Sequence, residues 1–174
     1  MNNQQITSLI STCSIINEHF RGVYAMDTLP KIEDWDKPSS CICNLDRSTE
    51  PGSHWISIFY PKNGPPEYFD SYGFDGKRFE FFLGETYYYN PHFLQFPFSV
   101  VCGQYCIYYL YKRSFMKSMY EVLKPFKLDD QLYNDFYVND FIEKHFNVDL
   151  KVFDMKFIIN QFNISYKQKE YDYK

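Results

Sequence analysis

Apolar and polar residues follow two different spacings along this chain, and each spacing predicts a different kind of element. Between residues 4 and 19, apolar residues recur every three or four positions, which predicts an amphipathic first helix. The segment 39–46 predicts a short strand, and 54–60 alternates with a period of two, which predicts another. After a turn rich in Pro, Gly and Asn, residues 67–71 predict the returning strand of a hairpin.

The second half of the chain changes to helical spacing. Residues 73–85 predict a short helix, whereas 87–99 are aromatic and interrupted by two prolines, which predicts an irregular or extended segment. The spacing over 102–116 is helical and its first ten positions carry no charge, which predicts a buried helix. A further helix is predicted over 132–146. The order of helix, strands, helix and helix indicates the α+β class.

Length and charge narrow the class of protein. The 174 residues fit a single domain, 1–174, whose core needs no disulfide or metal, and the polar end at 167–174 predicts a disordered tail. A net charge of −4 argues against a general nucleic-acid surface but leaves a local basic patch open. No run of about 18 apolar residues could span a membrane, and the first 16 residues do not resemble a signal peptide. We therefore expect an intracellular protein with no membrane partner.

The five cysteines do not form a recognisable framework. Their number is odd and their spacing scattered, which argues against disulfides. Cys41 and Cys43 form a C-x-C pair, but no further ligands stand near it at the spacing of a zinc site. In an alternating strand both side chains would point to the same face. We therefore expect no metal and no resident cofactor.

Cys102 and His54 have the surroundings of a nucleophile and its base. Cys102 stands at the predicted start of a buried helix, where oriented amides favour a thiolate, and Gly103 leaves room for a substrate. His54 stands at the start of a strand directly after a polar turn, where an imidazole can reach into a cleft and pair with a thiolate. Taken alone, Cys102 is better explained as a buried core cysteine and His54 as a surface or capped residue.

Two more residues complete a possible catalytic group. Asp70 lies across the predicted hairpin from His54, where a carboxylate would orient the imidazole. Glu67 and Asp75 are alternative candidates for orienting the imidazole, but they stand closer to turns. Gln95 precedes the cysteine by seven residues, and its amide could donate to an oxyanion beside the backbone N–H of the nucleophile. Each of these residues has a simple surface explanation alone; the order His, Asp, Gln, Cys in these contexts indicates a cysteine hydrolase.

The same order carries a resemblance to a known family. A His-Trp pair at a strand start, a D/E-x-[YF]-G-F turn, and a Gln several residues before a Cys-Gly at a helix start resemble the adenovirus-type maturation proteases, the adenains. Segments 20–30, 39–61, 68–79 and 131–146 look like adenain segments in the same order, so the likeness spans about residues 4 to 146. Short, aromatic-rich proteases of this type occur in virophages and Polinton-like DNA elements.

The resemblance implies a fold, an activity and a setting. The fold would be that of papain-like proteases of the adenain and Ulp clan, with a central mixed sheet and a buried helix that carries the nucleophile. The activity would be a cysteine endopeptidase that cleaves viral capsid or structural precursors during virion maturation, at sites containing Gly. We expect a monomer that works in virus factories of the host cytoplasm and is packaged in the virion.

The resemblance also implies the parts of individual residues. His54 would be the base, Asp70 its orienter, Cys102 the nucleophile and Gln95 a member of the oxyanion hole. Trp55 would line the narrow channel that admits the substrate, although a core position in its strand explains it equally well.

Two departures from the adenains concern regulation. The adenovirus enzyme is basic and stimulated by DNA, whereas this chain is acidic. The adenovirus enzyme also binds an activator peptide through a cysteine between its carboxylate and its nucleophile, and no cysteine stands between Asp70 and Cys102 here. The sequence therefore gives no support for a DNA or peptide activator.

Two alternatives stay open at this point. One is a Ulp-type peptidase, similar to deubiquitinases and deSUMOylases, that acts on ubiquitin-like tails after Gly-Gly. The other is a non-catalytic, capsid-associated interaction module on the same fold. Substrate panels distinguish the first, and reactivity of the Cys102 thiol distinguishes the second.

Overall fold

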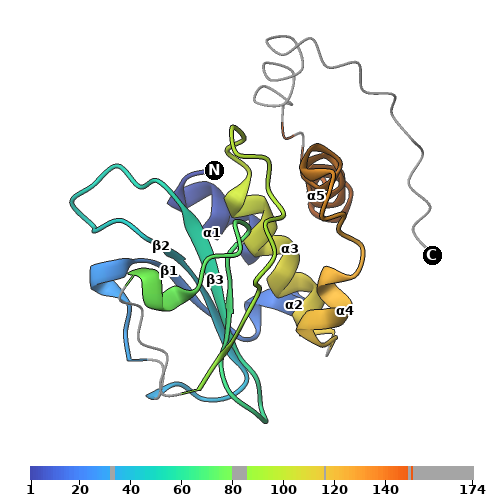
Figure 1. Cartoon of the computed structure of the whole chain (residues 1–174). Coiled ribbons are helices and arrows are strands. Elements are labelled where there is room, and N and C mark those ends of the chain that lie inside the picture. Colours follow the sequence, from blue (N-terminus) through green and yellow to red (C-terminus); the bar gives the residue numbers. More distant parts are fainter. Residues whose placement is uncertain (32–33, 80–85, 116, 149, 151–174) are drawn as a thin grey trace.

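The computed structural model describes residues 1–31, 34–79, 86–115, 117–148 and 150. Within them, a five-stranded mixed sheet lies against a set of helices, and the helix α3 runs beside the sheet (Figure 1). This arrangement confirms the α+β class. None of the described helices is long and apolar enough to cross a membrane.

The strands follow one another across the sheet in the order of the chain. Those at the two edges pair in parallel, β1 with β2 and β4 with β5, whereas β2, β3 and β4 form an antiparallel core. The strands are β1 (Phe20–Ala25), β2 (Ser39–Asn44), β3 (Trp55–Tyr60), β4 (Glu67–Phe69) and β5 (Tyr88–Tyr89). The hairpin predicted from the alternating pattern is therefore present as β3 and β4, with β3 beginning one residue after His54.

Alternation along the strands gives the sheet two apolar faces. On one face, Cys41, Cys43, Ile56 and Ile58 form a small buried cluster with Tyr68. The two cysteines share this face, as their spacing predicts, and both are free thiols. On the other face the strands contribute to the main core, which they share with the helices.

The predicted first helix is in fact two. α1 (Asn3–Ser11) begins with a capping box between Asn2 and Gln5, and the short α2 (Ser14–Asn17) follows. The break has a local cause: the Thr12 hydroxyl donates to the carbonyl of Leu9, and Cys13 is extended. The β-branched Thr thereby ends the first helix, and the single helix expected over 4–19 is wrong at this point.

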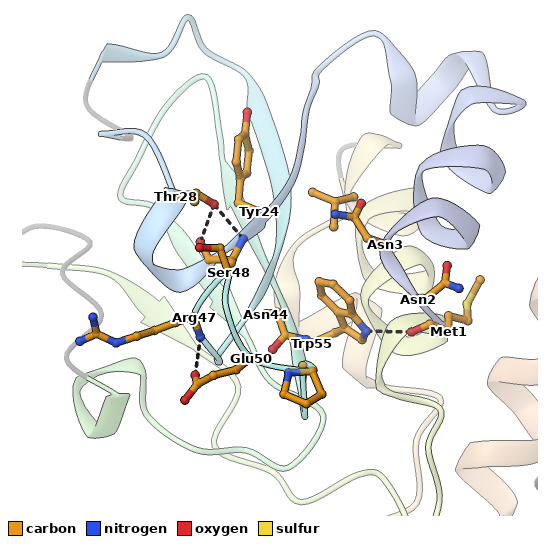
Figure 2. Close-up of a pocket in the computed structure, with 14 residues that line it drawn as sticks. Met1, Asn2, Asn3, Tyr24, Thr28, Asn44, Arg47, Ser48, Glu50 and Trp55 are labelled. Carbon is orange, nitrogen blue, oxygen red and sulfur yellow. Dashed lines mark hydrogen bonds between the residues drawn. The ribbon is translucent and has the colours of Figure 1, made fainter.

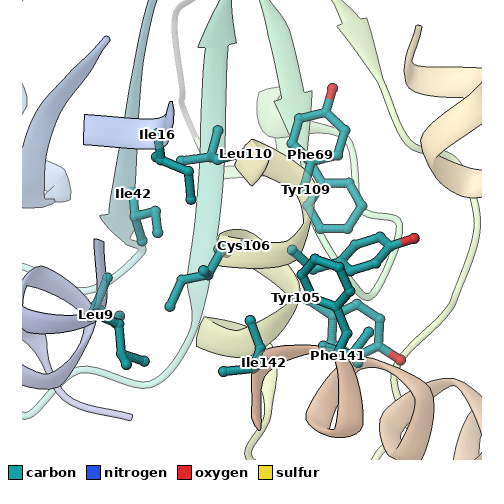
Figure 3. Packing of buried hydrophobic residues seen from close by; sticks show 14 of the residues in the cluster. Leu9, Ile16, Ile42, Phe69, Tyr105, Cys106, Tyr109, Leu110, Phe141 and Ile142 are labelled. Carbon is teal, nitrogen blue, oxygen red and sulfur yellow. The ribbon is translucent and has the colours of Figure 1, made fainter. Parts of the chain in front are cut away.

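The central helix is α3 (Cys102–Ser114), and its first nine residues are all buried. α4 (Met119–Leu123) follows, and α5 (Gln131–Phe146) packs along α3. Figure 3 shows side chains of α1, α3, α5 and the sheet meeting in one core, with Cys106 of α3 pointing inward. The predictions of helices over 102–116 and 132–146 are confirmed within two residues.

The remaining expectations concern the less regular segments. The helix expected over 73–85 is present only as a 3-10 turn, η3 (Gly76–Phe79), and residues 80–85 lie outside the described part of the chain. A second 3-10 turn, η1 (Met26–Thr28), follows β1. The segment 87–99 holds the two residues of β5 and is otherwise irregular, as predicted. The tail expected at 167–174 also lies outside the described residues.

Candidate active site

The candidate nucleophile stands at the first position of the central helix. Cys102 begins α3, and only 7% of its surface is exposed. The first N–H groups of a helix have no acceptor inside the helix and carry partial positive charge, so they favour an anion at this position. The sequence predicted this placement, and the fold adds the burial that excludes most of the water around the sulfur.

His54 and Asp70 form a close pair at one end of the hairpin. The His54 Nε2 atom lies 2.8 Å from Asp70 Oδ1, and 12% and 0% of the two side chains are exposed. The register of β3 and β4 explains this contact. Ser57 lies opposite Phe69, so continuing the register by one step places Asp70 opposite Ile56, two residues from His54. A carboxylate reaches such a diagonal neighbour across an antiparallel pair.

The pair leaves one imidazole nitrogen for the thiol. Because Asp70 holds Nε2, Nδ1 is the nitrogen left for Cys102, whose thiol interacts with His54 closely enough for the imidazole to lower its pKa. The backbone of Trp55 also contributes to the lowered pKa of the Cys102 thiol. The structure therefore brings the hydrogen-bonded pair of His54 and Asp70 together with Cys102 in one site.

Electrostatics favours the charged forms of the thiol and the imidazole. Burial alone would raise the pKa of Cys102, but the hydrogen bond and positive charge of His54 outweigh burial and lower it. Burial alone would lower the pKa of His54, but hydrogen bonds and charge from Asp70 and Cys102 raise it to about 9. A thiolate beside an imidazolium is the reactive state of a cysteine nucleophile.

Gln95 is buried beside these groups, with 1% of its surface exposed. Its carboxamide oxygen accepts from the Ser71 hydroxyl at 2.8 Å. Its nitrogen donates to the Ser99 carbonyl at 2.9 Å and to the Tyr72 hydroxyl at 3.1 Å. Gln95 is therefore not the surface residue that its polar character alone suggests.

Trp55 borders both the site and a neighbouring cavity. Its indole N–H donates to the Met1 carbonyl at 3.0 Å, and its ring is half-buried against the main core. The cavity has a volume of about 420 Å³ and is also lined by Asn44 and Gly52 (Figure 2). The two readings of this residue, core packing and channel wall, thus both have a physical basis in the fold.

The two competing carboxylates have other partners. Glu67 forms an ion pair with Arg113 and accepts from the Tyr109 hydroxyl. Asp75 accepts from the Tyr87 hydroxyl and from a backbone N–H. Neither is hydrogen bonded to His54, so Asp70 is the one of these three carboxylates that pairs with the imidazole.

Sequence reasoning missed several residues that hold the site. Tyr72 stacks on the His54 ring, with centroids 4.8 Å apart, although the sequence showed it only as part of the turn motif. On α5, the Asn134 amide donates to the Leu94 carbonyl, and Asp135 accepts from the Phe96 N–H, so α5 fixes both neighbours of Gln95. The available signal was two adjacent polar residues within the apolar stripe of the last helix.

Among the described residues, no group of three or more His, Cys, Asp or Glu side chains could hold a metal ion.

The chain matches no protein-family model, and no curated protein matches it by sequence. Fold and site thus define an α+β protein in which a cysteine at a helix start lies in one site with a histidine that is hydrogen bonded to a buried aspartate.

Proposed function

We propose that this protein is a cysteine endopeptidase with a papain-like fold of the adenain and Ulp clan. The observation that carries the proposal is the buried grouping of Cys102, His54 and Asp70 at the start of α3, with Asp70 hydrogen bonded to His54 Nε2 and the thiol and imidazole coupled electrostatically. Such a grouping supplies a nucleophile, a base and an orienting carboxylate, which are the parts that covalent catalysis on a carbonyl requires.

The proposed reaction begins with the thiolate of Cys102 and the imidazolium of His54. The sulfur attacks the scissile carbonyl, a C–S bond forms, and the carbonyl electron pair moves to oxygen. His54 then gives its proton to the leaving amine as the C–N bond breaks, and water later hydrolyses the thioester with His54 as base. Asp70 keeps the imidazole in one orientation throughout and stabilises its charged form.

The oxyanion that forms during attack needs hydrogen-bond donors. The backbone N–H of Cys102 is one, because it is among the first amides of α3 and has no acceptor within the helix. Gln95 and Tyr72, which are hydrogen bonded to each other, are the candidates for the other. Losing one donor of this kind typically slows catalysis by about a hundredfold or more.

The proposed substrates are viral capsid or structural precursors cleaved at Gly-containing sites during virion maturation. This part rests on the resemblance of the quoted motifs to the adenains, together with Trp55 beside the cavity next to the site. A narrow channel at this tryptophan would favour residues without a side chain. In this proposal the protein acts as a monomer, in the virus factory and in the virion, without a resident cofactor.

Mass spectrometry of co-expressed coat-protein precursors tests the proposal. With the native chain we expect trimmed termini at Gly-containing sites, and with Cys102→Ala we expect none, a loss of at least about 10³-fold. Cys13→Ala is the matched control, because it removes a half-buried thiol on the segment between α1 and α2 and should leave trimming unchanged. Complete processing by the Cys102→Ala protein, folded as judged by circular dichroism, would rule out the assignment.

The same assay distinguishes the alternatives. Cleavage of ubiquitin or SUMO conjugates after Gly-Gly, with intact coat precursors, would assign the site to a Ulp-type peptidase. Failure of Cys102 to react with iodoacetamide at neutral pH would instead favour a non-catalytic module, because a thiolate paired with an imidazolium alkylates readily.

A further inference from the structure

Tyr72 contacts three of the four residues of the proposed catalytic group. Its backbone N–H donates to Asp70 Oδ1 at 2.7 Å. Its ring stacks on the His54 imidazole at 4.8 Å with an interplanar angle of 26°. Its hydroxyl accepts a hydrogen bond from Gln95 Nε2 at 3.1 Å. A role in closing the turn does not account for all three of these contacts.

The surroundings of Gln95 fix which end of its carboxamide faces Tyr72. A backbone carbonyl can only accept, so the group that faces the Ser99 carbonyl at 2.9 Å must be the nitrogen. The oxygen then lies toward the Ser71 hydroxyl, which donates to it at 2.8 Å. The nitrogen is therefore also the atom that meets the Tyr72 hydroxyl, and the direction of that hydrogen bond is set.

This arrangement has a consequence for the oxyanion. A carboxamide has two N–H hydrogens, and here one points to Ser99 and the other to Tyr72. Neither is free for a substrate while these contacts last. The Tyr72 hydroxyl, by contrast, accepts from Gln95 and keeps its own hydrogen, which goes to no protein acceptor in the described part of the chain.

The hydroxyl is also suited to stay protonated. Burial, and then the charges of Cys102 and Asp135, raise the pKa of Tyr72 to about 12. Tyr72 thus remains a neutral donor at the pH where the thiolate of Cys102 exists. The stacking of its ring on His54 and the hydrogen bond of its hydroxyl with Gln95 place the phenol among the proposed catalytic residues.

We propose that the Tyr72 hydroxyl is an oxyanion donor of this site and that Gln95 acts through it, by holding the phenol oxygen and polarising its O–H bond. The inference rests on the proposed function. During attack the C–S bond forms and the carbonyl electron pair becomes the oxyanion, which accepts a hydrogen bond from Tyr72 without taking its proton. Hydrogen bonds in series strengthen one another, so the Gln95 contact makes Tyr72 a better donor.

The substitution Tyr72→Phe isolates the hydroxyl. Phenylalanine keeps the ring that stacks on His54 and the backbone N–H that donates to Asp70, and it frees one N–H of Gln95. If Gln95 were the donor by itself, the variant would be at least as active as the native chain. Tyr87→Phe is the matched control, because its hydroxyl contacts Asp75 outside the catalytic group.

Two small reagents separate the nucleophile from the oxyanion. Iodoacetamide alkylates the thiolate by displacement at saturated carbon, so no oxyanion forms. p-Nitrophenyl acetate acylates the thiolate through a tetrahedral oxyanion, with release of p-nitrophenolate that is followed by absorbance. We expect Tyr72→Phe to leave the alkylation rate of Cys102 and its pH profile within about twofold and to lower acylation at least about tenfold.

The outcomes of this comparison are distinct. Unchanged or faster acylation by Tyr72→Phe would overturn the inference and leave Gln95 as the donor. An equal fall in both rates would also overturn it, because Tyr72 would then only support the fold or the His54 ring. If native Cys102 reacts with neither reagent faster than Cys102-independent background, the proposed function fails, and this inference fails with it.

Discussion

Strand β4 has a buried carboxylate at each end, and the two are used in opposite ways. Glu67 begins the strand, and Asp70 directly follows its last residue. Both lie close to a basic side chain from another element, Arg113 of α3 for the first and His54 before β3 for the second. The two ends therefore offer a comparison between an ion pair that holds the fold and one that we propose takes part in a reaction.

At the Glu67 end every group has a partner. Arg113 donates from Nε at 2.6 Å and from Nη2 at 2.9 Å, one hydrogen bond to each carboxylate oxygen, and Tyr109 donates as well. Arg113 also donates to the Lys117 carbonyl and lies over the Phe59 ring. A two-point contact of this kind fixes geometry and joins the far end of α3 to the sheet.

At the Asp70 end the contacts are incomplete. Oδ1 accepts from both the Tyr72 N–H and His54, whereas Oδ2 is buried with no hydrogen-bond partner among the described residues. His54 in turn uses Nε2 for Asp70 and keeps Nδ1 for Cys102, whose charge raises the pKa of the imidazole. The fully hydrogen-bonded pair of Glu67 and Arg113 stabilises one ionised arrangement. The incompletely hydrogen-bonded pair of Asp70 and His54 keeps an imidazole that can give and take a proton. Incompletely paired buried groups are typical of reactive sites.

The largest expected effect is on the rate of cleavage and concerns Asp70, at the end of β4 beside His54. We expect Asp70→Ala to lower the rate of precursor cleavage by about 10²- to 10⁴-fold, because the imidazole loses both its orientation and its stabilising charge. Cleavage kinetics measured on folded protein check this. Asp75→Ala is the control, since Asp75 contacts Tyr87 instead of His54 and its loss should leave the rate within about twofold. Equal loss from both variants would remove the distinction between the two carboxylates.

The second largest expected effect is on stability and concerns the ion pair of Glu67 and Arg113. We expect Glu67→Gln to lower the free energy of unfolding by about 3 kcal/mol, because Arg113 would stay buried without its counter-charge. Urea denaturation measures this, and the cleavage rate per folded molecule should stay near the native value. Lys144→Ala, which breaks a more exposed pair with Asp140, should cost less than about 1 kcal/mol. A Glu67→Gln protein that is stable but inactive would place this pair in the reaction.

The smallest expected effect is the pH dependence of thiol alkylation, which we expect to differ between Cys102 and Cys106 of α3. The pKa of Cys102 is lowered, mainly by His54 against the opposing effect of burial, whereas burial raises the pKa of Cys106. We expect iodoacetamide to label Cys102 at a lower pH than it labels an ordinary thiol, and to leave Cys106 unlabelled. Peptide mapping of labelled protein gives both rates.

The same pair of groups sets the alkaline limit of catalysis. The pKa of His54 is raised to about 9, so His54 is charged below that pH and loses its proton above it. Cleavage that needs His54 as an acid should fall about tenfold for each further pH unit. Labelling of Cys102 only at alkaline pH, or equal labelling of Cys106, would contradict the thiolate and imidazolium pair.

Much of the fold and the site follows from local patterns. Alternation gives β3, helical spacing gives α3 and α5, and the sequence alone selects Cys102 and His54 by their positions at element starts. The first helix was harder, because Thr12 hydrogen bonds back to Leu9 and divides it, an interaction that apolar spacing does not reveal. Buried polar residues on α5 were missed for a related reason, since their partners lie on a distant loop.

The sequence by itself determined the coarse order of helix, strands and helices, the α+β class and the identity of the residues that could carry out thiol chemistry, because these depend on spacing along one chain. The sequence favoured Asp70 over Glu67 and Asp75 only because those two stand closer to turns, and the tertiary structure decided between the three carboxylates by placing Asp70 beside His54. The tertiary structure also decided that the Gln95 amide nitrogen donates a hydrogen bond to the Tyr72 hydroxyl. Hydrogen-bond direction depends on partners from several elements, and those partners meet only when the chain has folded.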